Sequence, residues 1–240
     1  MNRPAPARTA GVVPAAGRGE RLGLGPAKAL RPLGGVPMLV LAVRALAEAR
    51  GVDVVVVAAP PDDRAEVQAL LSAYDIGTEV VIVPGGATRQ ESVRRALAAL
   101  PPEVEIVLVH DAARPLAPSE LADAVVQAVR DGYDAVVPAL PVADTIKRVD
   151  EAGRVLETLP REQLRAVQTP QGFRRQLLAD AHAAAPPADP TLTDDAGLVE
   201  RIGVAVHVVP GHPEGLKVTR PIDVVFAEAL LARRWARHAP

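Results

Sequence analysis

Short apolar runs alternate with amphipathic stretches along most of this chain. The runs are rich in β-branched residues and are bounded by turn residues, which predicts β-strands at residues 10–14, 53–59, 79–83, 105–110, 134–139 and 205–209. Between them, apolar residues recur at helical spacing, as at Val93, Ala96, Leu97 and Leu100. Such alternation predicts one α/β domain over residues 1–240, Rossmann-like, with a mostly parallel sheet covered by helices on both faces.

The segment 141–167 interrupts this alternation. Two short alternating stretches, 144–149 and 154–158, are joined by a polar turn that contains Gly153, which predicts a β-hairpin projecting from the domain. An isolated hairpin is only marginally stable in water, so we expect this arm to pack against another surface. A second copy of the chain is favoured over the arm's own domain, which makes the arm a predicted dimerisation element.

Composition narrows the possible partners. With 49% hydrophobic residues and a formal net charge of -2, the chain has the apolar content of a folded domain and no broad basic field for a nucleic-acid backbone. No apolar run approaches the roughly 18 residues of a membrane span, residues 1–10 lack a signal-peptide core, and there is no cysteine. We therefore expect a cytoplasmic protein that binds neither nucleic acid nor membrane.

The first predicted strand leads into a loop that is suited to an anionic ligand. Its small residues, whose backbone N–H groups can approach a ligand closely, are Ala15, Ala16, Gly17 and Gly19. Arg21 and Lys28 are spaced to bring positive charge to the same place, as a polyphosphate requires. A dinucleotide-binding turn would need glycine where Leu22 stands, and a Walker A loop would need Ser or Thr after Lys28. On this segment alone, an ordinary strand-to-helix turn stays open.

Other polar residues follow the predicted strands, and ligands of such sheets bind at the carboxyl ends of the strands. Asp111 is the candidate metal ligand, since Mg²⁺ accepts one carboxylate together with substrate phosphates; the alternative is a capping or salt-bridging aspartate, for example one paired with Arg114. His110 directly follows a strand, and a structural role is favoured for it over a catalytic base. Lys217 is either a surface residue or a pocket cation. Thr193 begins a Thr-Asp-Asp run that is typical of a helix N-terminus.

A set of motifs in order along the chain resembles one family. The motifs are Pro-Ala-Ala-Gly-x-Gly-x-Arg with Pro-x-Lys at 14–28, Gly-Gly with Ser-Val at 85–93, Val-His-Asp-Ala-Ala-Arg-Pro at 109–115, Asp-Thr-Ile-Lys at 144–147, Gln-Thr-Pro-Gln at 168–171, Thr-Asp-Asp-Ala at 193–196 and Lys-Val-Thr-Arg-Pro at 217–221. From about residue 10 to residue 230 the chain resembles the 2-C-methyl-D-erythritol 4-phosphate cytidylyltransferases of the non-mevalonate isoprenoid pathway. Two positions depart from that pattern: Ala87 stands where an acidic residue is common, and Glu91 where aspartate is common.

The resemblance implies a nucleotidyltransferase domain with CTP and 2-C-methyl-D-erythritol 4-phosphate as substrates, Mg²⁺ as cofactor, and a homodimer built through the arm. It implies these catalytic residues: Arg21, Lys28, Arg161 and Lys217. It implies these nucleotide contacts: Ala15, Ala16, Gly17, Gly19, Lys28, Gly86 and Ser92. It implies these substrate contacts: Asp111, which also binds the metal, Ala112, Arg114, Thr145, Arg161, Thr169, Thr193 and Lys217. Thr145 and Arg161 would reach the neighbouring subunit's site.

The expected reaction is a direct in-line attack of the acceptor phosphate on the α-phosphorus of CTP, since the attacking phosphate is already anionic and no convincing nucleophile is present. Two alternatives remain at this point. One is a cytidylyltransferase that acts on ribitol 5-phosphate, which shares the glycine loop and the Asp-Ala-Ala-Arg segment. The other is a nucleotide-sensing module that kept the fold without catalysis.

Overall fold

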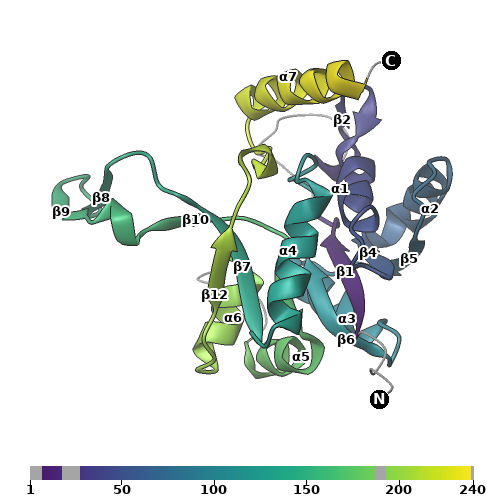
Figure 1. Ribbon diagram of the computed structural model, residues 1–240, viewed down its shortest axis with the longest axis horizontal. Helices are drawn as coiled ribbons and strands as arrows, with labels where there is room; N and C mark the ends of the chain where they lie inside the picture. Colours follow the sequence, from purple (N-terminus) through teal and green to yellow (C-terminus); the bar gives the residue numbers. More distant parts are fainter. Residues whose placement is uncertain (1–6, 18–27, 187–192, 239–240) are drawn as a thin grey trace.

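A computed structural model of the protein describes residues 7–17, 28–186 and 193–238. The central sheet has the strand order β10-β7-β11-β6-β1-β4-β5, with β12 also pairing with β7 (Figure 1). All six predicted strands form, each within two residues of its predicted bounds: β1 (Arg8–Pro14), β4 (Val54–Ala59), β5 (Glu79–Pro84), β6 (Val104–Val109), β7 (Ala135–Pro141) and β12 (His207–Pro210). The pairs β1·β4, β1·β6, β4·β5 and β7·β12 are parallel, which confirms a mostly parallel sheet.

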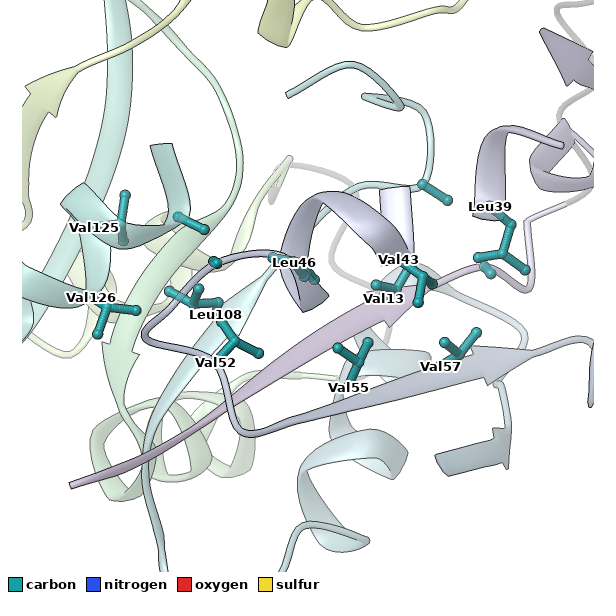
Figure 2. Close-up of a cluster of buried hydrophobic side chains, with 14 of the residues drawn as sticks. Val13, Leu39, Val43, Leu46, Val52, Val55, Val57, Leu108, Val125 and Val126 are labelled. Carbon is teal, nitrogen blue, oxygen red and sulfur yellow. The ribbon is translucent and has the colours of Figure 1, made fainter. Parts of the chain in front are cut away.

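Helices cover both faces of the sheet, as predicted. One face carries α1 (Met38–Ala47), α2 (Arg64–Ser72) and α4 (Ser119–Arg130), and the other carries α3 (Arg89–Ala98), α5 (Arg175–Ala184) and α6 (Asp195–Arg201). Figure 2 shows Val55 and Val57 of β4 facing α1, while Val54 and Val56 belong to the core on the opposite face. Every residue of β4 is buried, as expected for a strand that is covered on both sides.

A third apolar cluster lies beside the sheet, under α7 (Pro221–His238). Leu231 of α7 packs there with Leu33 of the short hairpin β2 (Pro32–Leu33) and β3 (Val36–Pro37). The helix begins with Pro221 and has Asp223 in its first turn, as the sequence predicts. None of the helices in the described part of the chain is long and apolar enough to span a membrane.

One strand in the middle of the sheet is not predicted. β11 (Gln171–Arg174) runs antiparallel between β6 and β7, and β10 (Arg165–Val167), which precedes it in the chain, also pairs antiparallel with β7. Only four residues long, β11 contains Gly172 and has no recognisable alternation. A Cβ atom on Gly172 would lie 2.4 Å from Cγ1 of Val125 in α4, so the helix packs directly on the backbone of this strand.

The predicted arm is a hairpin that projects away from the sheet (Figure 1). It consists of β8 (Ile146–Val149) and β9 (Val155–Leu159), followed by the short helix η4 (Arg161–Gln163). The bounds differ from the predicted 141–167: Pro141 ends β7, and β10 pairs with β7. The segment that leaves the domain is thus shorter than expected. Apolar side chains on the arm are exposed, including Val149 at 51% and Val155 at 54%.

Gly172→Ala tests the close packing of α4 on β11. Because the added methyl group would overlap Val125, we expect the substitution to lower the free energy of unfolding by about 1–3 kcal/mol, the usual cost of overpacking a core. Urea denaturation measures this change. Combining it with Val125→Ala, which removes the overlapping atom, should cost less than the sum of the single substitutions. Strictly additive losses would contradict the proposed contact.

Candidate nucleotide site

A pocket of about 280 Å³ opens at the carboxyl ends of β1, β5 and β6, where the sequence analysis places the ligand. Its wall is formed by Pro14, Ala15, Ala16, Gly17, Ala29, Gly86, Ala87, Thr88, Arg89, Ser92, Asp111, Ala112, Ala113 and Lys217. The loops after β1 and β5 come together at a glycine: a Cβ on Gly85 would lie 2.5 Å from Cβ of Ala16. The ends of these strands thus converge on one cleft, at the edge of the sheet where a ligand is expected.

The loop between β5 and α3 is held in shape by residues of the helix that follows it. The hydroxyl of Ser92 accepts a hydrogen bond from the amide of Gly86 at 3.0 Å and donates one to the carbonyl oxygen of Thr88 at 2.9 Å. Glu91 accepts from the amide of Ala87 at 2.8 Å. Both departures from the family pattern thus meet in one contact, in which Glu91 anchors the backbone of Ala87. Ser92 positions the Gly86 backbone along the pocket.

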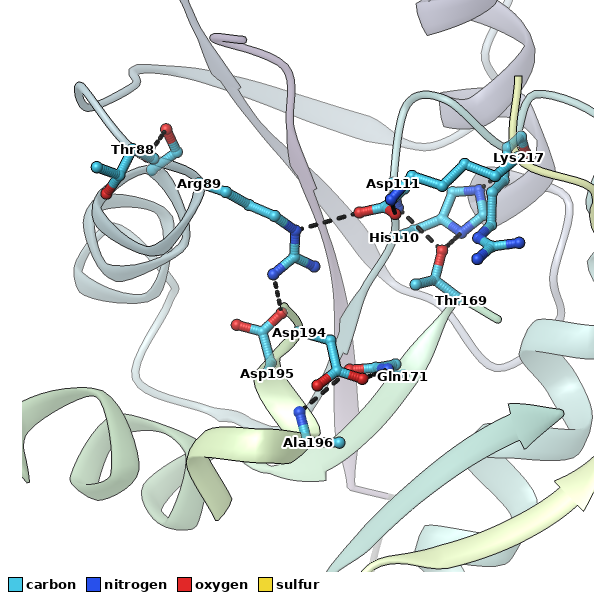
Figure 3. Close-up of polar contacts among 12 residues, drawn as sticks. Thr88, Arg89, His110, Asp111, Thr169, Gln171, Asp194, Asp195, Ala196 and Lys217 are labelled. Carbon is cyan, nitrogen blue, oxygen red and sulfur yellow. Dashed lines mark hydrogen bonds and ion pairs between the residues drawn. The ribbon is translucent and has the colours of Figure 1, made fainter. Parts of the chain in front are cut away.

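Two cations face the carboxylate of Asp111 (Figure 3). Nε of Arg89 lies 3.2 Å from Oδ1, and Nζ of Lys217 lies 2.7 Å from Oδ2. Burial alone would raise the pKa of Asp111, but the charges of Arg89 and Lys217 outweigh it and hold the pKa well below its ordinary value. The group is therefore an ionised carboxylate at the wall of the pocket. Lys217 lines the pocket, and its side chain is 41% exposed.

Arg89 is the site residue that the sequence analysis missed. Its Nη1 atom lies 2.7 Å from Oδ2 of Asp195, so one guanidinium joins Asp195 to Asp111 (Figure 3). Burial acts to lower the pKa of Arg89, yet these two carboxylates raise it above its ordinary value. A signal was present in the sequence, because Arg89 is the first residue of α3 and a positive charge there opposes the helix dipole. A positive charge at this position is expected to have a negatively charged partner outside its own helix.

Behind the pocket, Thr169 fixes the loop that carries Asp111. Its hydroxyl accepts a hydrogen bond from the amide of Asp111 at 3.0 Å and lies 3.0 Å from Nδ1 of His110. Nε2 of His110 lies 3.2 Å from the carbonyl oxygen of Arg114. Complete burial lowers the pKa of His110 to about 4, which keeps the ring neutral at pH 7. This network supports the structural role predicted for His110.

Arg114 does not pair with Asp111. It donates hydrogen bonds to the carbonyl oxygens of Gly215 at 2.7 Å and Val167 at 3.1 Å. These bonds tie the turn after β6 to the segment that carries Lys217, and the amide of Val218 donates to the carbonyl oxygen of Ala113 at 2.7 Å in the same place. Arg114 therefore helps to position Lys217 by fixing the backbone of the segment that carries it.

Two glutamines around Thr169 complete this framework. Gln168 donates to the carbonyl oxygen of His212 and accepts from its amide, both at 2.9 Å, which fixes the segment before Lys217. Gln171 donates to Asp194 at 2.7 Å and accepts from the amide of Ala196 at 3.2 Å, at the start of α6 (Figure 3). The short segment 168–171 is thus bonded to three parts of the site.

The remaining predicted site residues fall into three groups. Thr145 directly precedes β8 and Arg161 begins η4, and neither residue lines the pocket of its own chain. Thr193 is exposed next to α6, whose N-cap is Asp194, which accepts from the amide of Gly197 at 3.0 Å. Gly19 and Arg21 lie outside the described residues. Lys28 begins the short helix η2 (Lys28–Leu30), and its side chain is outside the described part as well.

The carboxylate of Asp111 fits a divalent ion that arrives with a triphosphate. Among the described residues there is no group of three or more His, Cys, Asp or Glu side chains that could hold a metal by themselves. Magnesium, however, is commonly bound through one or two carboxylates together with substrate phosphates. Asp111 offers one such hard oxygen ligand at the pocket wall.

Comparison with known proteins agrees with this geometry. The family model for 2-C-methyl-D-erythritol 4-phosphate cytidylyltransferase matches residues 9–233. The chain belongs to this family. It is 60% identical over 237 residues to the Streptomyces coelicolor protein of that name, covering 95% of this chain and 87% of that one. A second relative, from Saccharopolyspora erythraea, is 54% identical over 92% of this chain and 98% of its own length.

Solved structures of cytidylyltransferases share the fold. The 2-C-methyl-D-erythritol 4-phosphate cytidylyltransferase of Thermus thermophilus is 38% identical and superimposes with a TM-score of 0.75, over 93% of this chain and 98% of that one. The 4-diphosphocytidyl-2C-methyl-D-erythritol synthase of Anaerococcus prevotii, 29% identical, has a TM-score of 0.82 over 94% of this chain and 96% of that one. The family resemblance of the sequence motifs is therefore confirmed.

Thr169→Val tests the role of the hydroxyl behind Asp111. The valine keeps the shape but leaves the amide of Asp111 and Nδ1 of His110 without their hydrogen bonds in a buried place, so the free energy of unfolding should fall by about 1–3 kcal/mol. Chemical denaturation gives the difference. Thr169→Ser retains the hydroxyl and should lose clearly less. Equal stability of the valine variant and the unmodified protein would argue against this network.

Proposed function

We propose that this protein joins CTP and 2-C-methyl-D-erythritol 4-phosphate to form 4-diphosphocytidyl-2-C-methyl-D-erythritol and pyrophosphate, a step in the synthesis of isoprenoid precursors. The observation that carries the proposal is the family membership over residues 9–233. A pocket lined by backbone and by an Asp111–Lys217 pair supports it, since these groups suit a nucleoside triphosphate.

In this mechanism the protein acts by position and charge. A phosphate oxygen of the acceptor attacks the α-phosphorus of CTP in line, and the bond from that phosphorus to the pyrophosphate oxygen breaks. The acceptor phosphate is already anionic at pH 7, so the site needs no general base. Lys217 stabilises the charge that develops on the phosphates, and Arg21 and Lys28 are proposed to do so from the glycine loop.

Asp111 is the proposed ligand of a divalent cation that binds together with CTP. When bound, such an ion would neutralise phosphate charge and polarise a phosphoryl oxygen. Arg89 and Lys217 keep the Asp111 carboxylate ionised in a place where burial would otherwise favour its protonated form. Thr169 and His110 fix the backbone from which it extends. The residues around Asp111 thus keep its carboxylate ionised and in a fixed position, as binding of a cation would require.

The arm is proposed to complete the site of a second subunit. Thr145 and Arg161 do not line the pocket of their own chain, and Val155 and Leu156 expose apolar surface on the arm. An exchange of arms in a homodimer would cover this surface and bring Arg161 to the acceptor phosphate of the partner's site.

The acceptor is tested by measuring pyrophosphate release with CTP and each sugar phosphate. We expect turnover with 2-C-methyl-D-erythritol 4-phosphate, and a kcat/KM at least about tenfold lower with ribitol 5-phosphate, because the acceptor contacts differ. Release that occurs only with ribitol 5-phosphate would overturn the proposed acceptor, and no release with either would favour a nucleotide sensor.

Asp111→Asn should lower turnover with 2-C-methyl-D-erythritol 4-phosphate by about 10²-fold or more, as expected on removal of a group that organises transition-state charge.

Arm exchange predicts complementation between two defective variants. Arg161→Ala and Asp111→Asn should each be weak as homodimers, whereas a mixed dimer would contain one site with both native residues. Mixing the two proteins after reversible dissociation should therefore restore activity, measured as pyrophosphate release. Lys217→Ala mixed with Asp111→Asn is the matched control, because both residues line the same pocket of one chain and no intact site can form. Failure of the first mixture to recover activity in verified mixed dimers would count against exchange.

A further inference from the structure

A buried pair on the far side of Arg89 has no part in the reaction described so far. Oδ1 of Asp195 lies 2.9 Å from Nε2 of His182, and Oδ2 of Asp195 lies 2.7 Å from Arg89. Asp195 is fully buried, and His182 is 2% exposed. Neither residue lines the pocket. The contacts run without a gap from His182 in α5, through Asp195 in α6 and Arg89 in α3, to Asp111 at the pocket.

Burial makes the contact between Asp195 and Arg89 hard to break. A carboxylate removed from water is costly unless a positive partner and hydrogen bonds compensate it. Burial would raise the pKa of Asp195, but the charge of Arg89 and the hydrogen bond from His182 outweigh this and lower it, so the group stays ionised. Nδ1 of His182 has no hydrogen-bond partner among the described residues. The polar contact shown for His182 is therefore its bond to Asp195.

The two carboxylates on Arg89 differ in their access to ligand. Asp111 lies at the pocket wall, where Lys217 also contacts it, so a cation that accompanies a triphosphate would compete with Lys217 and Arg89 for its oxygens. Asp195 lies behind the wall, where the start of α6 is fixed by the hydrogen bond from the Ala196 amide to Gln171. Asp195 does not line the pocket, so a ligand there would meet Arg89 and Asp111 but not Asp195.

We propose that Asp195, supported by His182, is a positioning residue for nucleotide binding, which keeps the guanidinium of Arg89 at the pocket wall when Asp111 turns to the ligand. The inference rests on the proposed function, because it concerns the same pocket. It assigns Arg89 to the triphosphate and gives the Asp195–His182 pair a purpose beyond stability. The effect of Asp195 on CTP must then pass through Arg89.

A double-mutant cycle on CTP binding tests this dependence. The dissociation constant of CTP is measured by isothermal titration calorimetry, with and without Mg²⁺, for Asp195→Asn, Arg89→Gln and the double variant. We expect each single variant to weaken CTP binding by about tenfold, and the double variant to bind CTP no more weakly than Arg89→Gln alone. In steady-state kinetics, the KM for CTP should rise while kcat at saturating CTP changes by less than about twofold.

A second variant and a control keep the test decisive if Asp195→Asn does not fold. His182→Leu retains both charges and should weaken CTP binding in the same direction but by less, about threefold. Asp123→Asn is the control: Asp123 pairs with Arg50 at 3.4 Å and accepts from the amide of Gly51, away from the pocket. It should leave CTP binding within about twofold of the unmodified protein.

The outcomes separate the inference from the proposed function. Normal CTP binding by Asp195→Asn, or by His182→Leu where the former is unfolded, overturns the inference while the unmodified protein still binds CTP. An Asp195→Asn effect that persists undiminished in the Arg89→Gln background also overturns it, because Asp195 would then act by another route. Absence of CTP binding by the unmodified, folded protein would instead contradict the proposed function.

Discussion

The site is organised around the partly buried carboxylate of Asp111. Asp111 places a carboxylate at the wall of a pocket that is to receive a still more negative ligand, and burial without compensation would neutralise it. Arg89 and Lys217 supply that compensation, and both also line the pocket. The groups that make the carboxylate possible are therefore the groups that a triphosphate needs. Most other polar contacts around the pocket help to position Asp111, Arg89 or Lys217.

A single antiparallel strand brings those contacts together. Because β11 runs opposite to β6, with Gln171 beside Val109, the residues that precede β11 lie at the edge where the parallel strands end. From there Gln168 reaches the segment before Lys217, Thr169 reaches Asp111, and Gln171 reaches the start of α6. The insertion of β11 also explains Gly172, where the backbone must lie against α4. Fold and site thus depend on the same short stretch.

Local sequence patterns were sufficient to predict the strands of the sheet and the pocket loops that offer backbone groups. The strands and the pocket loops follow from apolar periodicity and glycine placement, and Ala15, Gly86 and Asp111 lie where strand ends predict them. β11 was missed because four residues with a central glycine carry no periodic signal. The Arg89–Asp195 contact was missed because it joins helices that are far apart in sequence. Asp195 itself reads as an ordinary first-turn acidic residue until the fold shows that it is completely buried.

The hydrogen bonds around His110 also determine where its ring proton resides. The carbonyl oxygen of Arg114 can only accept, so Nε2 must carry the hydrogen, and in a neutral imidazole Nδ1 is then an acceptor. The hydroxyl of Thr169 therefore donates a hydrogen bond to Nδ1 and accepts one from the amide of Asp111. This neutral tautomer satisfies every group in the network. The direction of a peptide unit beside the pocket is thus linked to the tautomeric state of a ring that solvent never reaches.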